Sequence, residues 1–311
     1  MRIGWRALIR NKLKAKSDSF TIGIAIDEDA VTFCALQKRK SNELALVHES
    51  VVSLQNWPVQ LKKWVESHGL SGANTHIAFS VAWYQQVQVD RPAVEEDEMD
   101  GALKWAVEEI LGSGEARAYD YFDLPVPLAG NNKINIVAVN ETAVVEAAEA
   151  CYGANLQLQS ISVEEVVTCN LPVGTELPVL TLIQEAGDEV CLNIVKNGEL
   201  YFSRRLKGFE NLSSFSAEEL RMGIADSLCV QIQRSMDYFE SQLRQAPISH
   251  IRIKMDSQYL DTLVEQVQQA VPAQIEIMRT GVTIPEQLNE LRLSYTALGA
   301  ALQQVSQGQT A

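Results

Sequence analysis

The residue types that most often carry out chemistry are scattered through this sequence and share no catalytic or metal-binding spacing. None of the four histidines has a second ligand type at the spacing that a metal ion requires. The acidic run 95–100 could be taken for a metal-binding segment, but acids are also favourable at the start of a helix. The sequence contains neither a Gly-x-Ser-x-Gly turn nor a P-loop. We therefore expect no metal site and no hydrolase chemistry. The histidines are His48, His68, His76 and His250.

The composition predicts an acidic cytoplasmic protein of two domains. A chain of 311 residues that is 46% hydrophobic is long enough for two compact cores. The net charge of −14 argues against a nucleic-acid binder, because an acidic surface repels phosphate. The five cysteines are odd in number and mostly lie among apolar neighbours, which indicates reduced thiols in the cytosol. No apolar run approaches the ~20 residues of a membrane span, and no cleavable signal peptide is evident.

The first 17 residues have a different character from the rest of the chain. They combine six basic residues with apolar residues, and several apolar residues share one face if the segment is helical. Such a basic amphipathic arm can lie on an anionic lipid surface or dock on a partner. A solvated arm fits the same residues, because a helix this short is marginal in water. The residues expected to face a membrane are Arg2, Trp5, Arg6, Leu8 and Arg10.

Two similar patterns of β-forming residues organise the remaining chain. Residues 179–206 alternate apolar runs with two polar turns, which predicts a three-stranded meander. Its second turn, Asn197-Gly198, favours a type I′ hairpin, because both central positions need a positive φ. Residues 20–47 repeat the same order of runs and turns. Two matching meanders indicate an internally duplicated fold.

The segments between and after the meanders complete the expected organisation. Residues 84–158 predict a small α/β unit inserted in the first half, and 172–178 predict the hinge between halves. Apolar residues from Leu220 to Leu243 recur at helical spacing, which predicts one long helix, and 285–305 predict a final helix. The expected units are an arm (1–17), a first lobe (18–83 plus 159–175), the inserted subdomain (84–158), a second lobe (176–305, with a long-helix subdomain at 217–277) and a tail (306–311).

In the order of its predicted elements and in several short sequence segments, this chain resembles the PilM family of type IV pilus assembly proteins. Within that family it resembles the MshI-type proteins of mannose-sensitive haemagglutinin (MSHA) pilus biogenesis. The resemblance implies the actin-like ATPase fold, a duplicated, ribonuclease H-like α/β fold of two lobes with a small inserted α/β domain. It also implies that Glu164 and Glu165 lie among contacts between domains. The segments that carry the resemblance are Tyr119–Tyr121, Ser160–Glu165, Lys196–Arg204, Gln233–Phe239 and Ala297–Leu302.

Actin-like ATPases hold nucleotide with glycine-bearing turns, and the resemblance shows where those turns have changed here. The family's Gly-Ile-Asp-Ile-Gly-Ser aligns with Gly23–Glu28, so that a metal-side aspartate is replaced by Ala25 and a phosphate-facing Gly-Ser by Asp27 and Glu28. Acidic side chains repel phosphate and block the backbone approach that glycine permits. We therefore expect a degenerate ATPase with no cofactor, in which ATP and Mg²⁺ could bind only if these turns still hold them. The other two turns align with Gln184, Glu185 and Gly187, and with Met255, Asp256 and Ser257.

The resemblance also implies a protein partner. PilM-like proteins bind the N-terminal cytoplasmic peptide of a PilN-like single-span inner-membrane protein where the inserted domain meets the first lobe. Aromatic and small residues around that junction would suit an extended apolar peptide, although aromatic residues are also common in a core. The residues expected to line the groove are Phe79, Trp83, Tyr84, Ala102, Trp105, Ala106, Tyr119 and Tyr121.

The function that follows is a cytoplasmic scaffold, peripheral on the inner membrane, that recruits a PilN-like tail and bridges to an assembly ATPase. One alternative is an active actin-like ATPase that switches or polymerises with nucleotide. Another is a small-molecule kinase of the same fold, which the altered turns disfavour as well. We expect Arg204, Arg205 and Arg234 to pair with carboxylates inside the protein.

Overall fold

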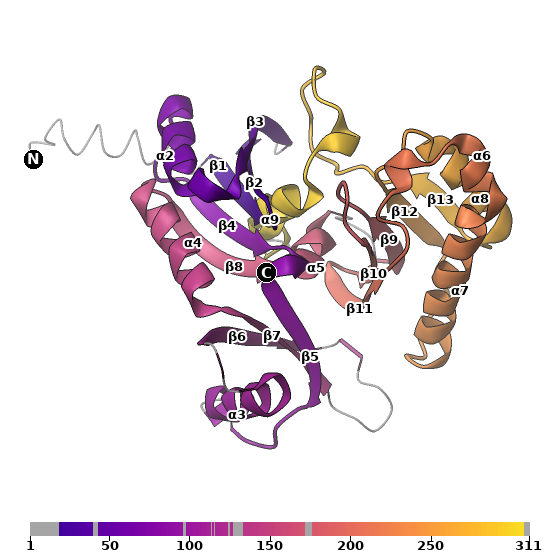
Figure 1. The fold of residues 1–311 in the computed structure, drawn as a ribbon, viewed down its shortest axis with the longest axis horizontal. Coiled ribbons are helices and arrows are strands. Elements are labelled where there is room, and N and C mark those ends of the chain that lie inside the picture. Colours follow the sequence, from indigo (N-terminus) through magenta and orange to yellow (C-terminus); the bar gives the residue numbers. More distant parts are fainter. Residues whose placement is uncertain are drawn as a thin grey trace, which may run out of the picture.

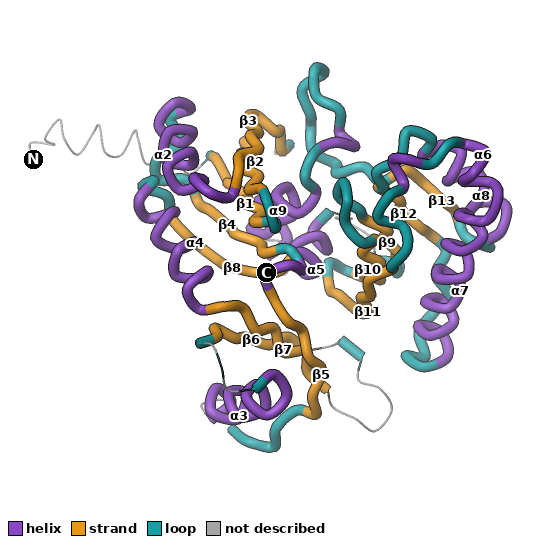
Figure 2. The backbone as a smooth tube through the Cα atoms, in the orientation of Figure 1, coloured by secondary structure: helices purple, strands orange, loops and turns teal. Residues whose placement is uncertain are grey.

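The computed structural model describes residues 19–39, 43–95, 98–112, 114, 116–123, 125–126, 133–171 and 176–307. The basic arm, most of the hinge and the end of the tail lie outside these described residues. Figure 1 shows two lobes side by side, with a smaller unit attached to the first lobe, and Figure 2 shows that each lobe is built around a sheet.

The first lobe contains a five-stranded sheet in the order β3-β2-β1-β4-β8. Strands β1 to β3 form the expected antiparallel meander, and β4 and β8 add to it in parallel. Helices α2 and α4 cover one face of this sheet and α9 covers the other. A strand that is covered on both faces is buried along its length, and the five residues Ile22–Ile26 of β1 are all buried. The elements are β1 (Phe20–Ile26), β2 (Ala30–Lys38), β3 (Leu44–Ser53), α2 (Trp57–His68), β4 (Asn74–Phe79), α4 (Glu141–Gly153), β8 (Gln157–Val163) and α9 (Tyr295–Gln307).

The second lobe repeats this arrangement with the strand order β11-β10-β9-β12-β13. The turn between β10 and β11 has φ of 53° at Asn197 and 77° at Gly198, as the type I′ hairpin requires. The two sheets thus have the same order of meander and parallel strands, which confirms the duplicated α/β fold. The elements are β9 (Val179–Ile183), β10 (Val190–Lys196), β11 (Glu199–Leu206), α7 (Ala225–Ser241), β12 (His250–Lys254), α8 (Leu260–Ala270) and β13 (Gln274–Ile277).

Two of the expected helices are shorter than the apolar pattern predicted. The helix expected from Leu220 onward is interrupted at Met222 and Gly223, and Gly223 has a φ of 127°. A short α6 (Ala217–Glu219) precedes this kink, and Ser216 and Glu219 form a capping box. The final helix begins at Tyr295 and not at 285, since the preceding residues form an irregular connection. Apolar spacing alone did not reveal the kink, because the stripe continues across it.

The inserted unit is a three-stranded antiparallel sheet in the order β5-β7-β6, with α3 packed on one face. Met99, Leu103 and Val107 of α3 contact Ile134 and Ile136 of β7. The following helix α4 was expected in the same unit, but it packs on α2 and contributes to the core of the first lobe. The elements of the unit are β5 (Tyr84–Asp90), α3 (Met99–Leu111), β6 (Arg117–Asp123) and β7 (Lys133–Asn140).

Helix α9 lies against the inner face of the first sheet, on the side that faces the second lobe. Gly23 permits this packing, because a Cβ added there would lie 1.9 Å from the carbonyl oxygen of Ala297. Gly23 therefore has a packing role in addition to its place before the first turn. No helix in the described part of the chain is both long and apolar enough to cross a membrane.

Candidate functional site

The turns that the resemblance assigns to nucleotide meet between the two lobes. A cavity of about 200 Å³ is lined by Asp27 from the β1–β2 turn and by Glu185 and Asp188 from the β9–β10 turn. The third turn lies beside the second, because the backbone N–H of Asp256 donates to Oε1 of Gln184 at 3.3 Å. The fold therefore brings together all three of these turns. We call this cavity the interlobe cleft, and it is smaller than the roughly 300–1,000 Å³ of typical ligand pockets.

Asp27 is bound by neighbouring groups of the first lobe. Its Oδ1 accepts hydrogen bonds from Ser80 Oγ at 2.8 Å and from the backbone N–H of Glu28 at 2.7 Å. Nε1 of Trp83 donates to the Asp27 carbonyl oxygen at 3.0 Å. Asp27 thus places a bound acidic side chain in the first of the turns that the resemblance assigns to nucleotide. Trp83, which we expected to line the peptide-binding site, instead stabilises this turn through its hydrogen bond.

The carboxylate of Glu185 binds two groups beside the cleft that would otherwise attract an anion. The backbone N–H of Tyr295, at the N-terminus of α9, donates to Glu185 Oε1 at 3.0 Å. The ammonium group of Lys254, which is almost fully buried, pairs with Oε2 of the same carboxylate. A helix N-terminus and a lysine are favourable partners for phosphate. Here they are neutralised from within the protein.

The described lining of the interlobe cleft holds five carboxylates and one basic residue, Arg292. Burial, together with the nearby carboxylates of Asp27 and Glu185, raises the pKa of Asp188 to about 6. Burial and the Glu185 carboxylate also raise the pKa of Glu49, which lines the same cavity. A pKa that is raised by neighbouring acids reports a negative potential at the site. The same potential disfavours a bound polyphosphate.

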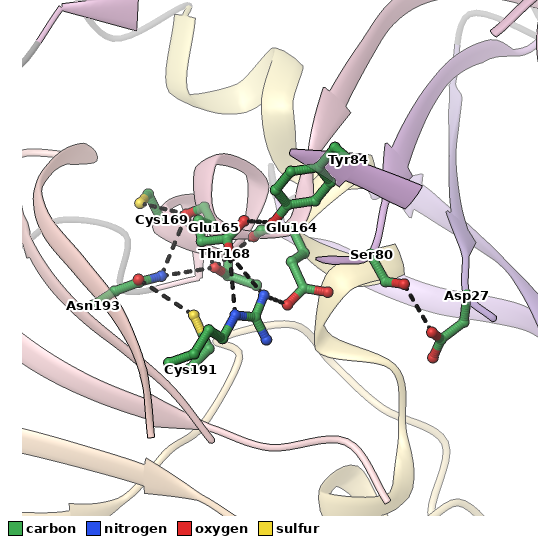
Figure 3. A network of polar contacts seen from close by, with 10 residues as sticks. Asp27, Ser80, Tyr84, Glu164, Glu165, Thr168, Cys169, Cys191 and Asn193 are labelled. Atoms are coloured by element: carbon green, nitrogen blue, oxygen red, sulfur yellow. Dashed lines mark hydrogen bonds and ion pairs between the residues drawn. The ribbon is translucent and has the colours of Figure 1, made fainter. Parts of the chain in front are cut away.

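A buried ion-pair cluster joins the lobes beside the cleft (Figure 3). Arg205, from β11 of the second lobe, donates to Glu165 Oε1 from Nη2 at 2.7 Å and from Nε at 3.1 Å, and it also pairs with Glu164. Both glutamates belong to α5 (Glu164–Val167) of the first lobe. The hydroxyl of Tyr84, at the start of β5, donates to Glu165 Oε2. The prediction that Arg205 pairs with carboxylates and that these glutamates lie between domains is confirmed, whereas Arg204 donates to the neutral side chain of Gln231 at 3.0 Å.

The composition of this cluster argues against a metal ion. The ligand atoms of Glu164, Glu165 and Cys191 lie within 4.8 Å of one another. However, the guanidinium group of Arg205 already binds both carboxylates. Burial also raises the pKa of the Cys191 thiol well above its usual value, which keeps it protonated. A metal ion needs deprotonated ligands. These residues therefore suit the guanidinium group of Arg205 better than a metal ion.

A second concave site lies between the inserted sheet and the first lobe. It has a volume of about 370 Å³ and is bordered by β6 and β8, each of which is the outermost strand of its sheet. Val137 and Val139 of β7 and Val163 of β8 contribute to a largely apolar lining. We call this site the peptide groove, because its position is that of the expected binding site. The other lining residues are Phe79, Ala118, Tyr119, Asp120, Tyr121, Phe122, Val144, Ile161, Ser162, Val166 and Gln303.

Only part of the expected set of groove residues lies in this groove. Phe79, Tyr119 and Tyr121 line it, whereas Tyr84 is buried in the ion-pair cluster. Ala102, Trp105 and Ala106 belong to α3, on the opposite face of the inserted sheet, and Trp105 is 68% exposed there. The prediction that these residues share one groove with Phe79 is therefore wrong, because α3 and the groove occupy different faces.

Two groove residues that the sequence analysis did not predict, Ala118 and Asp120, follow from the alternation of side chains along β6. Ala118 lies opposite Val139, and Asp120 opposite Val137, so their side chains share the groove face. Tyr119 and Tyr121 lie opposite Ala138 and Ile136, and their rings pack with the α3 cluster. The tyrosines therefore reach the groove mainly through their backbone. The period-2 pattern of 117–123 was a usable signal, but it needed the pairing with β7 to assign the faces.

Comparison with known proteins supports the fold. No protein-family model and no curated protein matches the sequence. A chain of a PilM–PilN type IV pilus biogenesis complex aligns over 92% of this chain and 98% of its own length, with a TM-score of 0.62 and 16% identity. The cytoplasmic domain of EpsL, an inner-membrane component of the type II secretion system of Vibrio cholerae, aligns over 94% and 96% with a TM-score of 0.51 and 8% identity.

These likenesses extend over nearly the whole length of both chains, so they concern the entire two-lobed architecture with its insertion. Identities this low establish architecture and not activity. Together with the duplicated sheets, they show that this chain has the actin-like ATPase fold.

Proposed function

We propose that this protein is a non-enzymatic adaptor of a type IV pilus assembly machine that binds the N-terminal cytoplasmic peptide of a PilN-like inner-membrane protein. The observation that carries the proposal is the peptide groove, an apolar site of about 370 Å³ between two edge strands. The fold likeness to a chain of a PilM–PilN complex supports the same assignment. The MSHA-type system, suggested by the resemblance in sequence, is the specific machine that we propose.

The edge strands that border the groove favour an extended peptide over a small molecule. An extended segment presents alternate side chains to one side, and its backbone can pair with an edge strand such as β8. The apolar lining would then receive the alternate side chains of the segment. The groove thus has both features of peptide recognition by strand addition.

Binding of a synthetic peptide tests this proposal directly. A fluorescein-labelled peptide with the first residues of the PilN-like protein from the same genome should show saturable anisotropy with the full-length chain. An unlabelled copy should compete, and a scrambled copy should not. Absence of saturable binding, or equal competition by the scrambled peptide, would contradict the adaptor function.

The interlobe cleft leads us to propose that the protein neither hydrolyses nor firmly holds ATP. Asp27, Glu185 and Asp188 oppose polyphosphate by charge, and Glu185 already binds Lys254 and the N-terminus of α9, which leaves Arg292 as the one cation in the described lining. Titration calorimetry with Mg-ATP should therefore show no saturable heat up to about 1 mM, where the binding free energy is only about −4 kcal/mol. Micromolar binding or steady phosphate release would favour the rival function, an actin-like ATPase that switches or polymerises, or a kinase of the same fold.

We further propose that the protein is cytoplasmic and peripheral on the inner membrane, where the basic arm 1–17 contacts anionic lipid and an assembly ATPase is a second partner. Each basic residue near such a surface contributes about 1 kcal/mol. Deletion of residues 1–17 should abolish co-sedimentation with anionic vesicles while the binding of the PilN-like peptide stays unchanged. Equal sedimentation of the full-length and shortened chains would argue against the membrane role of the arm.

A further inference from the structure

One charged side chain stands out in the peptide groove. Among the described residues that line it, Asp120 alone carries a charge, and every other lining side chain is apolar or neutral. We propose that Asp120 selects a peptide in which a lysine or arginine accompanies the apolar side chains. This inference rests on the proposed function and adds to it the chemistry of the segment that the groove accepts.

The backbone directs Asp120 toward the groove. Asp120 lies opposite Val137 in the β6–β7 pair, and Val137 is part of the groove lining. Side chains of directly opposed residues share one face of a sheet. The backbone N–H of Tyr121 donates to Asp120 Oδ1 at 2.8 Å, which orients the carboxylate. The side chain is exposed, so a ligand can reach it.

A second aspartate on the same strand gives the natural contrast. Asp123 lies opposite Ile134, on the face that α3 covers, and it pairs with Arg91. No described lysine or arginine forms such an ion pair with Asp120. Asp123 therefore has a cationic partner in the same chain, whereas Asp120 presents its charge at an apolar site.

A single exposed acid favours selectivity over strength. An ion pair at a wet rim changes affinity only about 2- to 5-fold, but a like charge at the same place is rejected. Cytoplasmic segments next to a membrane span carry an excess of lysine and arginine. The tail of a single-span membrane protein thus supplies the combination of apolar and basic residues that the lining of this groove fits.

Selection from a random library tests this inference without knowledge of the natural partner. Displayed dodecapeptides are selected on the immobilised full-length protein, on Asp120→Lys and on the matched control Asp123→Lys. The wild type should enrich apolar segments with a lysine or arginine at a fixed position. Asp120→Lys should replace that residue by aspartate or glutamate, and Asp123→Lys should retain the wild-type preference.

A selected peptide then gives a quantitative check. Replacement of its basic residue by glutamine should weaken binding about 2- to 5-fold at low salt. The difference should disappear in about 0.5 M NaCl, where exposed charges are screened. The same substitution should have no effect on binding to Asp120→Asn.

The outcomes separate this inference from the function on which it rests. If apolar peptides are enriched with no charge preference and Asp120→Lys selects the same peptides, the role of Asp120 is wrong and the groove function stands. If Ala118→Trp, which fills the groove, leaves the selected peptides unchanged, the peptides do not bind there, and both the inference and the groove function are overturned.

Discussion

The interlobe cleft and the peptide groove lie in the same two-lobed framework, yet they differ in nearly every property that decides what a site can bind. The cleft is a cavity of about 200 Å³ lined by several carboxylates, whereas the groove has about 370 Å³ and a mostly apolar lining. In the cleft, Glu185 occupies the helix N-terminus and the lysine that would attract an anion. In the groove, two edge strands border the site.

This difference shows that the fold determines where a site lies, whereas the side chains that line the site determine what it can bind. The cleft is also closed by protein groups, since Arg205 of the second lobe is bound to α5 of the first. Within the cleft, Asp27 and Glu185 already have hydrogen-bond or ion-pair partners in the protein. The groove, by contrast, leaves an apolar surface and one acidic side chain available to a partner.

The largest expected effect comes from breaking the cluster that closes the cleft. Arg205→Met leaves Glu164 and Glu165 buried without their cation, so the free energy of unfolding should fall by about 3–5 kcal/mol. Urea denaturation measures the change. Arg204→Met is the matched control, because Arg204 donates to the neutral side chain of Gln231 and its loss should cost far less. Equal losses in the two variants would show that the cluster does not hold the lobes together.

The next effect tests the groove. Ala118→Trp places a large ring in the lining, so binding of the PilN-like peptide should weaken at least about 30-fold, as for loss of an interface hot spot. Fluorescence anisotropy measures the affinity, and a circular-dichroism melt checks that the variant is folded. Trp105→Ala, on the far face of the inserted sheet, should bind as the wild type does. A loss of binding in Trp105→Ala alone would move the site to α3.

The smallest effect tests the acidity of the cleft through pH. The folded-state pKa of Asp188 is raised to about 6 from an ordinary value of 3.8, mainly by burial. Its folded form thus binds the proton more tightly, so this group makes the protein less stable as pH rises from about 4 to 6. Asp188→Asn should stabilise the protein by about 1 kcal/mol at neutral pH, after allowance for solvent screening, and by less near pH 4.

Urea denaturation at pH 4.5 and pH 7.5 measures this difference. Glu265→Gln is the control, because Glu265 is an exposed acid on α8, outside the cleft. If Asp188→Asn and Glu265→Gln change the free energy of unfolding equally at pH 7.5, a negative charge in the cleft does not destabilise the protein.

The predictions from sequence succeeded where the signal was local. Asn197-Gly198 identified the hairpin, because the turn chemistry acts within four residues. The duplicated sheets followed from runs of β-forming residues. The predicted long helix failed at Gly223, where a positive φ interrupts a continuous apolar stripe.

The candidate site was predicted less well, because its parts come from distant segments. Aromatic residues were assigned to one groove by type, and α3 carried Trp105 to the opposite face of the inserted sheet. Asp120 was not distinguished from Asp123, since the face of each depends on the pairing of β6 with β7. Tyr84 was expected to line the groove, but it is buried in the ion-pair cluster, where its partner Glu165 lies 81 residues away.

By itself, the sequence determined the strands, their tight turns and the acidic residues in those turns, because backbone propensity and residue identity act over a few neighbours. Tertiary structure alone decided that Arg205 would join the two lobes and that Asp120, and not Asp123, would face the groove. Both outcomes depend on which strands pair and which face a helix covers. Contacts between residues far apart in the chain set those choices, so they are defined only once the whole chain has folded.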